Sequence, residues 1–435
     1  MIVMKFGGTS VGGATEISSV CEIVRGRLER KPIVVVSAVK GITDKLLACI
    51  SSGSGHEEVK QIHDKIIDEL GLNPELLSEE FKELSEVLAS KSDYTEDEFS
   101  DRIASFGERM SSKIVAAALS SKGIKAEAFN AYDIGFVTDN NFINAEILNE
   151  TYKNIKKNFK FDGIVPVVTG FIAKNKSGKI TTLGRGGSDY TATIIGSAID
   201  AEEVEIWTDV NGVKTTDPKI VPEAETIDVL SFAEASELAF FGAKVLHPKT
   251  IIPAIDKKIP VRVLNTHEPR HKGTLIVHER ESVRKGAIKA VTSKRNICVI
   301  TITSTRMVDA YGFLEKLFRI FSKQGVSVDV VSTSEVSVSA TVEGKTNLEP
   351  LVKDIEKYAH VNIEKDKALI AVVGEGLKNN SSDVAARVFR CIADEGINVH
   401  MISQGASEIN LSFVINDEYV DNAIRTIHNK CIVSK

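Results

Sequence analysis

Short apolar runs alternate with amphipathic stretches over the first two thirds of the chain. The run Pro32–Val36 is β-branched and apolar on every side, which is typical of a strand buried in a parallel sheet. Similar runs predict strands at 2–4, 163–169, 203–207 and 260–264, and helical spacing predicts helices at 14–30, 190–197 and 232–240. Strands that alternate with helices predict an α/β domain with a largely parallel central sheet sandwiched by helices.

Two stretches depart from this alternation. Residues 43–122 have helical spacing almost throughout, which predicts a helical insertion or lid. After residue 296, shorter elements repeat in the order β-α-β-β-α-β, and Gly325–Val328 corresponds to Gly396–Val399. This duplication predicts two ferredoxin-like units. The expected boundaries are 1–285 for the α/β domain, 286–296 for a linker, 297–366 for the first unit and 367–435 for the second.

Composition is ordinary for a globular protein, with 43% hydrophobic and 26% charged residues. The net charge of −6 argues against nucleic acid as the main partner, which would require a basic face. The five cysteines are widely spaced and form no CxxC pair, so free thiols in a reducing compartment are expected. The first residues, MIVMKFGG, lack the basic start and long apolar stretch of a signal peptide, and no apolar run approaches the roughly 18 residues that span a bilayer. A cytoplasmic protein without membrane contact is therefore expected.

The first predicted strand runs into a glycine loop, KFGGTS at residues 5–10. Glycine lets the backbone approach a ligand closely, its N–H groups can form an anion nest, and Lys5 adds a positive charge. One interpretation is a phosphate cradle, and the other is a plain strand-to-helix turn with a surface lysine. The loop is not a Walker A motif, because GxxxxGK[ST] does not occur in the chain.

A second glycine loop, GRGGSDYTA at residues 184–192, opens a predicted helix. Ser188 or Asp189 could simply cap that helix. A helix N-terminus also suits a phosphate or a carboxylate, and Arg185 offers a two-pronged fork for a carboxylate. Asp189 could hold Lys5 or the water shell of a metal ion.

Two further clusters complete the candidate chemistry. The stretch WTDVNG at 207–212 follows a predicted strand, and open α/β sheets bind ligands at the carboxyl ends of their strands. The stretch FGAKVLHP at 241–248 puts Lys244 at a glycine turn. His247 precedes a proline and is assigned no role.

Together, and in this order, these loops resemble the aspartate kinases of the amino-acid kinase superfamily. The matching motifs are KFGGTS (5–10), SAVKGIT (37–43), FGERMS (106–111), GRGGSDYTA (184–192), WTDVNGVKTTDP (207–218), ELAFFGAKVLHP (237–248) and VSVDVVSTSEVSVS (326–339). The resemblance covers essentially the whole chain and implies the amino-acid-kinase fold. It also implies that the β-carboxylate of L-aspartate attacks the γ-phosphate of ATP, taken with Mg²⁺, to give 4-phospho-L-aspartate and ADP. This reaction is the first step toward lysine, threonine and methionine. Because a carboxylate is already ionised at pH 7, catalysis is expected to rest on positioning and charge neutralisation.

The resemblance also implies roles for individual residues. Lys5 would hold the transferred phosphoryl group, and Asp189 would orient Lys5. Aspartate would be bound by Thr43, by Glu108 at its α-ammonium and by Arg185 at its α-carboxylate. The nucleotide would contact Lys5, Phe6, Gly7, Gly8, Thr208, Asp209, Lys214, Lys219, Lys244 and Val245. No side chain is assigned as a metal ligand.

Three of these positions have a weaker basis. Taken by its spacing alone, Glu108 on an amphipathic helix would be a solvated charge. Lys214 stands where some relatives have an aromatic residue for the adenine, and lysine does not stack in the same way. Lys219 stands where an arginine often follows Asp-Pro, and lysine offers no bidentate contact.

The paired C-terminal units resemble ACT domains, which sense small molecules and usually pair side by side. A homodimer through these units is therefore expected, with a tetramer as the alternative. An amino-acid effector would contact Met307, Asp309, Phe313, Leu314, Val328, Asp329 and Ser334. The region around these residues looks closest to lysine-sensitive members, so L-lysine is the expected inhibitor and threonine the alternative. A strand is expected over 326–331, and its alternation would separate Asp329 from Val326, Val328 and Val330, so that its carboxylate could meet an effector ammonium.

Other functions stay open at this point. The C-terminal units could be an assembly module without a ligand. The chain could also be an amino-acid sensor whose kinase fold has lost activity, although Lys5, Glu108, Arg185 and Asp189 together favour an enzyme. A sister kinase that acts on another carboxylate or a carbamate is a further alternative. The paired ACT-like units and the KFGGTS start favour aspartate as the substrate.

Overall fold

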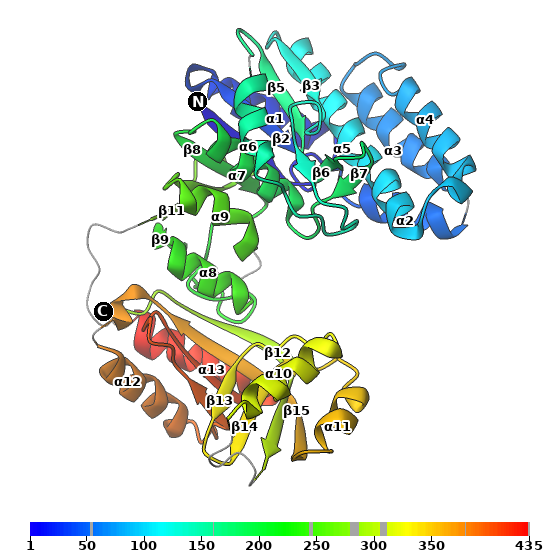
Figure 1. Cartoon of the computed structure of the whole chain (residues 1–435). Coiled ribbons are helices and arrows are strands. Elements are labelled where there is room, and N and C mark those ends of the chain that lie inside the picture. The colour runs from blue at the N-terminus through cyan, green and yellow to red at the C-terminus, as the bar shows by residue number, and fades with distance from the viewer. Residues whose placement is uncertain are drawn as a thin grey trace. The chain divides into compact units, whose positions relative to one another are not determined.

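The computed structural model describes residues 1–52, 55–159, 161–242, 247–278, 287–304, 311–378 and 380–433. These residues form two compact units (Figure 1). Unit 1 lies within residues 1–213, 226–232 and 245–280, and unit 2 lies within residues 214–225, 233–244 and 281–435. Two short segments of the expected α/β domain therefore belong to unit 2.

An eight-stranded sheet forms the centre of unit 1. Its strands are β1 (Ile2–Phe6), β2 (Pro32–Val36), β3 (Ala126–Phe129), β5 (Val165–Thr169), β8 (Glu203–Thr208), β9 (Val229–Ser231), β10 (Val261–Asn265) and β11 (Thr274–Val277). The strand order is β3-β5-β2-β1-β8-β10-β11-β9, and all neighbours are parallel except β10 and β11. The largely parallel sheet that the sequence predicts is confirmed, with β1 between β2 and β8.

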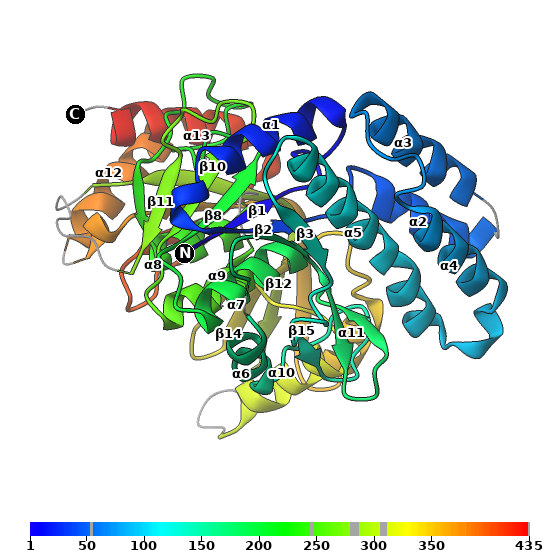
Figure 2. The same cartoon turned by 90° about the horizontal axis from the view of Figure 1, so that it is seen from above.

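Helices cover both faces of this sheet (Figure 2). Alternate residues of β1 point to opposite faces. Met4 and Phe6 join the apolar core that includes α1 (Ala14–Arg25) and α5 (Glu96–Ser121). The opposite face is covered by α7 (Gly187–Ala198), where a Cβ on Gly196 would lie 2.7 Å from Val204 and 3.8 Å from Val3. Lys5 shares the face of Val3 and therefore points toward α7.

The helical insertion predicted at 43–122 is also confirmed. It comprises α2 (Ile42–Ser52), α3 (His56–Glu69), α4 (Ser78–Ala89), the short helix η2 (Lys91–Asp93) and α5. The side chain of Thr95 accepts a hydrogen bond from the Glu98 N–H at 3.4 Å, which caps α5 at its first turn. Unit 1 also contains η1 (Leu28–Arg30), α6 (Glu150–Asn158), α9 (Pro248–Asp256) and a small sheet of β4 (Val137–Thr138), β6 (Ile172–Asn175) and β7 (Ile180–Thr182).

A six-stranded antiparallel sheet forms the centre of unit 2. Its strands, in spatial order, are β13 (Val331–Thr333), β14 (Ser337–Glu343), β12 (Ala290–Thr303), β15 (His360–Val373), β17 (Asn410–Asn416) and β16 (Met401–Ser403). The helices and turns of this unit are α8 (Phe232–Phe240), α10 (Phe313–Lys323), α11 (Glu349–Ile355), α12 (Ser381–Asp394), α13 (Val420–Ile427), η4 (Glu375–Leu377), η5 (Asp417–Tyr419) and η6 (His428–Val433). One apolar core involves α10 and α11, and a second involves α12 and α13. Two ferredoxin-like halves thus share one sheet.

The two halves are interleaved in a way that the sequence did not indicate. Residues 290–294, which the sequence analysis assigned to a linker, form the start of β12 and pair with Leu369–Val373 of β15. They add a strand to the second half of the sheet, in which the chain after α13 forms η6. The sequence did not predict this strand because Thr292, Ser293 and Lys294 are all polar. Strand prediction depends on apolar residues at alternate positions, and these three residues do not provide them.

A second difference concerns the strand predicted over 326–331. The described strand there, β13, begins only at Val331. The N–H of Asp329 donates to the Thr341 carbonyl at 3.0 Å, and the N–H of Val330 donates to the Thr341 side chain at 3.0 Å. Because one residue of β14 binds two successive N–H groups, the regular ladder is interrupted before β13.

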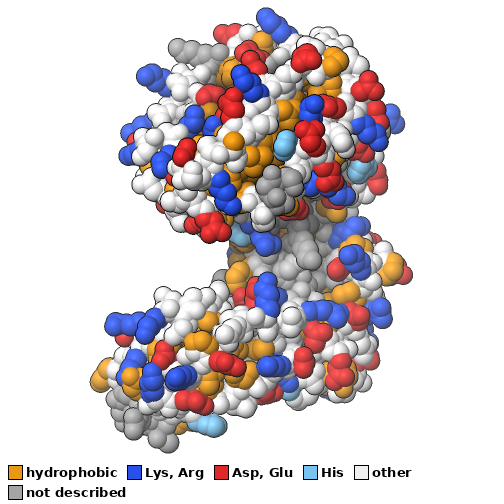
Figure 3. All heavy atoms as spheres, turned by 90° about the vertical axis from the view of Figure 1, so that its right-hand side faces the viewer, with side chains coloured by type: hydrophobic (Ala, Val, Ile, Leu, Met, Phe, Trp, Pro, Cys, Tyr) orange, Lys and Arg blue, Asp and Glu red, His pale blue; other side chains and the backbone are white. Residues whose placement is uncertain are grey.

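The visible surface carries both signs of charge, and the cysteines are free thiols. Lys, Arg, Asp and Glu are interspersed over the visible face of each unit (Figure 3), in keeping with the net charge of −6. All five cysteines carry free thiols and are buried. In the described part of the chain, no helix has both the length and the apolar character that crossing a bilayer would require.

Candidate active site

The loop after β1 lies against the ends of its two neighbouring strands. The N–H of Gly7 donates to the carbonyl of Trp207, near the end of β8, at 3.1 Å. A Cβ on Gly8 would lie 2.9 Å from the carbonyl oxygen of Ala38, which follows β2. Only glycine allows so close an approach, and it leaves the loop backbone at the carboxyl ends of the parallel strands, where such sheets bind ligands.

Lys5 forms an ion pair with the first turn of α7, the helix that covers its face of the sheet. Its Nζ lies 2.6 Å from Oδ1 of Asp189, and the two side chains are only 11% and 14% exposed. Asp189 thereby fixes the direction of the Lys5 side chain. A partly buried ammonium in this geometry can attract an anionic ligand because little water screens it.

Three glycines shape the entry to α7. Gly184 and Gly186 have φ values of 71° and 72°, a left-handed conformation that favours glycine. A Cβ on Gly187 would lie 2.7 Å from the ring of Phe171. The loop therefore brings the N-terminus of α7, with its free N–H groups, to the same place as Lys5 and creates an anion-binding end.

Glu108 reaches the same region from the middle of α5. Its Oε1 accepts a hydrogen bond from the Ala38 N–H at 3.0 Å, whereas its Oε2 is buried and has no hydrogen-bond partner among the described residues. Burial raises the pKa of Glu108 to about 8, and its backbone hydrogen bonds and the charge of Lys5 lower it only in part. A carboxyl of this kind is ready to accept a cationic or hydrogen-donating ligand.

A cavity of about 500 Å³ joins these elements within unit 1. Its lining residues come from the ends of β1, β2 and β8, from the start of α2, from α5 and from the entry to α7. They are Lys5, Gly7, Gly8, Thr9, Ser37, Ala38, Val39, Lys40, Gly41, Thr43, Asp44, Glu108, Phe171, Gly184, Gly186, Gly187, Ser188, Asp189 and Thr208. Its charged lining residues are two lysines, Lys5 and Lys40, and three acidic residues, Asp44, Glu108 and Asp189.

Half of the catalytic, aspartate and nucleotide candidates named from the sequence are brought together here. Lys5, Thr43, Glu108, Asp189 and Thr208 line the cavity, as do Gly7 and Gly8. Arg185 is exposed between two glycines that line it.

Other nucleotide candidates lie elsewhere. The ring of Phe6 is buried and stacks on Trp207, with centroids 5.9 Å apart, so this side chain serves the core. Asp209 accepts a hydrogen bond from the Thr208 hydroxyl at 3.1 Å but does not line the cavity. Lys214 and Lys219 belong to the segment 214–225 of unit 2, where Lys214 donates to the Ala224 carbonyl at 3.1 Å. Lys244 and Val245 lie outside the described residues.

Several cavity residues were not singled out from the sequence. Lys40 lies within the SAVKGIT motif, and its charge was a usable signal. Ser37 and Asp44 gave no comparable signal, and Ser188 was considered only as a helix cap. Phe171 has a φ of 65°, which is unusual for an aromatic residue and is a feature of backbone geometry that no sequence pattern indicates.

The predicted effector residues lie in unit 2. Met307 and Asp309 fall outside the described residues, Phe313 and Leu314 open α10, and Val328 and Asp329 lie before β13. The hydroxyl of Ser334 lies 2.7 Å from that of Ser337. Both carboxylate oxygens of Asp329 accept hydrogen bonds from Nζ of Lys294, at 2.8 and 2.7 Å. The carboxylate expected to meet an effector ammonium therefore already holds an ammonium of the chain itself.

The acidic residues of the cavity allow a test of the expected Mg²⁺. Among the described residues, no group of three or more His, Cys, Asp or Glu side chains could hold a metal ion. Asp44 lines the cavity, and Asp189 is paired with Lys5. Mg²⁺ usually keeps several waters and binds through one or two carboxylates together with substrate phosphates. The residues therefore fit a Mg²⁺ ion that arrives on the phosphates of a nucleotide.

Comparison with known proteins adds independent information. Residues 1–265 match the amino acid kinase family, and residues 370–431 match the ACT domain. Aspartokinase 1, chloroplastic, from Arabidopsis thaliana is 40% identical, over 98% of this chain and 79% of its own length. The crystal structure of E. coli aspartokinase III in complex with aspartate and ADP (R-state) matches with a TM-score of 0.85 and 31% identity, over 99% of each chain. The structure of E. coli aspartokinase III with lysine and aspartate (T-state) matches with a TM-score of 0.82 and 31% identity, again over 99% of each chain.

Proposed function

The chain belongs to the amino acid kinase family and, within it, to the aspartokinases, and from this premise we propose how its residues bind the two substrates and how it is regulated. An aspartokinase transfers the γ-phosphate of ATP to the β-carboxylate of L-aspartate. We propose that the 500 Å³ cavity of unit 1 is the site of this transfer. One observation carries this proposal. The same cavity contains the Lys5–Asp189 ion pair and Glu108, whose Oε2 has no hydrogen-bond partner among the described residues.

The transfer brings two anions together, and the cationic groups at the cavity reduce this repulsion. Lys5 and the loop N–H groups of Gly7 and Gly8 bind the transferred phosphoryl group, and Asp189 keeps Lys5 in place. The N-terminus of α7 adds further N–H groups on the same side. No general base is required, because the attacking carboxylate is ionised at neutral pH. Catalysis then consists of holding the acceptor oxygen in line and neutralising charge.

The opposite side of the cavity binds aspartate. Glu108 takes the α-ammonium with its free Oε2, and Arg185 takes the α-carboxylate from the mouth of the cavity, while Thr43 completes the pocket. ATP enters with Mg²⁺ on its phosphates, and the ion would supply further charge neutralisation there. Thr208 and Asp209 are proposed for the nucleotide side, and Lys214, Lys219, Lys244 and Val245 stay proposals for that side from the sequence resemblance alone.

A direct assay tests the reaction and its acceptor. The acyl phosphate product reacts with hydroxylamine, so the hydroxamate that forms with aspartate, glutamate or acetylglutamate identifies the substrate. We expect product with aspartate alone. Product with another acceptor and none with aspartate would replace the proposed substrate.

The Arg185→Ala variant is expected to raise the KM for aspartate by about 10- to 100-fold, because a hydrogen bond to a charged group contributes about 1.5–3 kcal/mol. The kcat should change much less. Steady-state kinetics at saturating ATP measures both constants. Arg185→Lys should be intermediate, because lysine keeps the charge but lacks the fork. An aspartate KM that is equal to the wild-type value in both variants would reject this role.

We also propose that L-lysine inhibits the enzyme through unit 2, with threonine as the alternative effector. The matched E. coli structure was solved with lysine. The Lys294–Asp329 pair supports a site for an ammonium, because a carboxylate that is only 8% exposed already binds one. An effector ammonium would have to replace Lys294, so the chain itself competes with its effector.

The Lys294→Met variant should therefore be inhibited by lysine at a concentration about tenfold lower than the wild type, since one charged hydrogen-bonding competitor is removed. Activity is measured while lysine, threonine or both are titrated. Lys367→Met is the matched control, because Lys367 is a buried lysine of the same sheet that binds Asn416 at 2.7 Å. Inhibition by threonine alone would overturn the choice of lysine. Equal lysine sensitivity in the wild type and Lys294→Met would overturn the competition.

The remaining expectations are part of this proposal. The enzyme is proposed to be cytoplasmic and a homodimer through its ACT units, with a tetramer as the alternative. The boundaries 1–285, 297–366 and 367–435 are proposed as the functional division of the chain. Sedimentation of the full chain with and without lysine would test the assembly state.

A further inference from the structure

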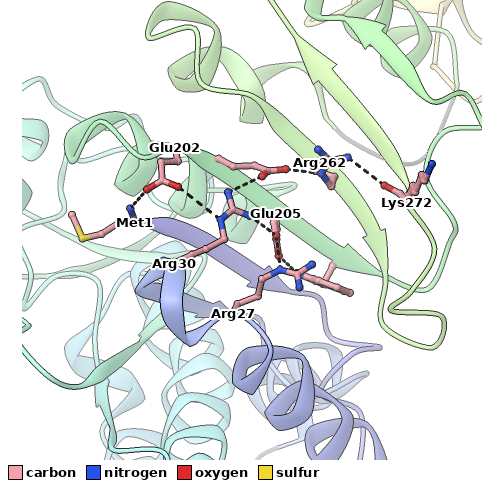
Figure 4. A network of polar contacts seen from close by, with 9 residues as sticks. Met1, Arg27, Arg30, Glu202, Glu205, Arg262 and Lys272 are labelled. Carbon is pink, nitrogen blue, oxygen red and sulfur yellow. Dashed lines mark hydrogen bonds and ion pairs between the residues drawn. The ribbon is translucent and has the colours of Figure 1, made fainter.

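The buried carboxylate of Glu205 on β8 binds two arginines and the indole of Trp207, whose backbone contacts the loop after β1. Glu205 is 1% exposed and accepts hydrogen bonds on both of its oxygens. Its Oε1 binds Nε of Arg27 at 3.1 Å and lies 3.4 Å from a terminal nitrogen of Arg30 (Figure 4). Its Oε2 accepts the indole N–H of Trp207 at 2.9 Å. The two arginines compensate the charge that burial would otherwise make costly.

Trp207 has further contacts through its ring and its backbone carbonyl. Its ring stacks on Phe6 with an interplanar angle of 20°, and the guanidinium of Arg27 lies 6.0 Å from the ring centroid. Its backbone carbonyl accepts the Gly7 N–H at 3.1 Å and lies 3.4 Å from the Ser10 hydroxyl. The next residue, Thr208, lines the cavity. The position of Trp207 therefore sets the position of two cavity walls, the glycine loop and the end of β8.

We propose that Glu205 is a positioning residue for phosphoryl transfer, which acts by orienting the Trp207 indole and, through the Trp207 carbonyl, the Gly7–Gly8 loop. Glu205 does not itself line the cavity. Its effect is geometric, because a catalytic loop that is misplaced by about 1 Å can lose about 100-fold in rate.

Glu203 offers an internal comparison for this proposal. It lies two residues before Glu205 on the same face of β8, is 8% exposed and belongs to the same charge network. Its partners are Arg30 at 2.9 Å and Arg262 at 2.6 Å. Both glutamates stabilise the packing over β8, but Glu205 holds Trp207, whereas Glu203 pairs only with arginines among its described contacts. A purely structural role predicts similar effects for both residues, whereas a positioning role predicts different ones.

The chain contains a single tryptophan, so its fluorescence reports on Trp207 alone. Glu205→Gln and Glu203→Gln are compared with the wild type in the full-length enzyme, by steady-state kinetics and by emission spectra with and without ADP. In Glu205→Gln we expect a shifted emission, a smaller change on ADP addition and a kcat about tenfold lower. In Glu203→Gln we expect spectra like the wild type and a kcat within about twofold, although its melting temperature falls to a similar extent.

Each outcome decides the proposal. Equal kcat and equal spectra in the two variants would overturn it, as would a wild-type kcat in Glu205→Gln. If Glu205→Gln does not fold, Trp207→Phe replaces it, because this variant keeps the stacking ring and removes the N–H. A folded Trp207→Phe enzyme with wild-type kcat would equally overturn the proposal, and a kcat about tenfold lower would support it.

Discussion

Replacing Lys5 by alanine is expected to lower kcat by at least about 100-fold, the scale of loss when one preorganised group that stabilises transition-state charge is removed. The ammonium lies 2.6 Å from Asp189 and lines the cavity, so its removal takes away a positive charge at the proposed phosphoryl site. It also leaves the Asp189 carboxylate there without its partner, which adds repulsion toward phosphate. Rapid-quench measurement of a single turnover separates this effect on chemistry from product release.

The matched control for Lys5 is Lys179. Its Nζ lies 2.7 Å from Glu98, whose side chain is 8% exposed, and neither residue lines the cavity. Lys179→Ala thus breaks a similar lysine–carboxylate pair away from the site and should keep kcat within about threefold of the wild type, since partly exposed pairs contribute little. A Lys5→Ala enzyme that is as active as Lys179→Ala would show that Lys5 has no part in the transfer.

The second large effect is expected in Glu108→Gln, for which the KM for aspartate should rise by about 100-fold. Glu108 is buried, and a buried charge-assisted hydrogen bond lies at the upper end of the range of such interactions. In the free enzyme its pKa is about 8, so most of it is protonated at pH 7. Binding the ammonium of aspartate requires the charged form, and the apparent affinity should therefore improve about tenfold from pH 6 to pH 7 and level off above pH 8.

Calorimetry offers a direct test of this titration. At pH 7, aspartate binding to the wild type should release close to one proton, which appears as a dependence of the binding heat on the ionisation enthalpy of the buffer. Glu108→Gln should show no such dependence when aspartate is raised to saturate it. The same buffer dependence in both proteins would assign the proton to another group.

The raised pKa also predicts an effect on stability. Between pH 4.5, the ordinary pKa of a glutamate, and pH 8, the Glu108 carboxyl is protonated to a greater extent in the folded than in the unfolded state. Its contribution to the free energy of unfolding therefore falls as the pH rises through this range. Glu108→Gln lacks this dependence. Its melting temperature should therefore rise relative to the wild type as the pH increases from 5 to 8. A constant difference over this range would contradict the raised pKa.

Much of the catalytic unit could be predicted from the sequence because its signals are local. The apolar run of β2 indicates a buried strand, and the glycines around Lys5 and Asp189 indicate places where backbone approaches a ligand. These signals sit at strand ends and at a helix start, so a parallel sheet brings them together. The ion pair between Lys5 and Asp189, 184 residues apart in the sequence, follows from that topology.

Other features depend on contacts that no local pattern encodes. The strand at 290–294 carries polar residues and is placed in the sheet by pairing with β15. From the sequence, Asp329 was expected to be free to meet an effector. Its carboxylate is instead paired with Lys294, which belongs to the strand at 290–294. Phe6 resembles a loop residue in the KFGGTS motif, yet its ring packs on Trp207 in the core. In each case a tertiary contact decides what the neighbouring sequence leaves open.

The interleaved sheet of unit 2 has a consequence for synthesis on the ribosome. The partner strand of Ala290–Lys294 is Leu369–Val373, although the Val291 N–H also donates to the Thr215 carbonyl at 2.9 Å. This partner strand is made at least 75 residues later, about 4–15 s at translation rates of roughly 5–20 residues per second. During that interval the half containing α10 and α11 can fold, whereas the start of β12 still lacks its partner strand. Such an edge can pair with another nascent chain. The polar residues Thr292, Ser293 and Lys294 make this strand less prone to aggregate with other chains before its partner strand has been synthesised.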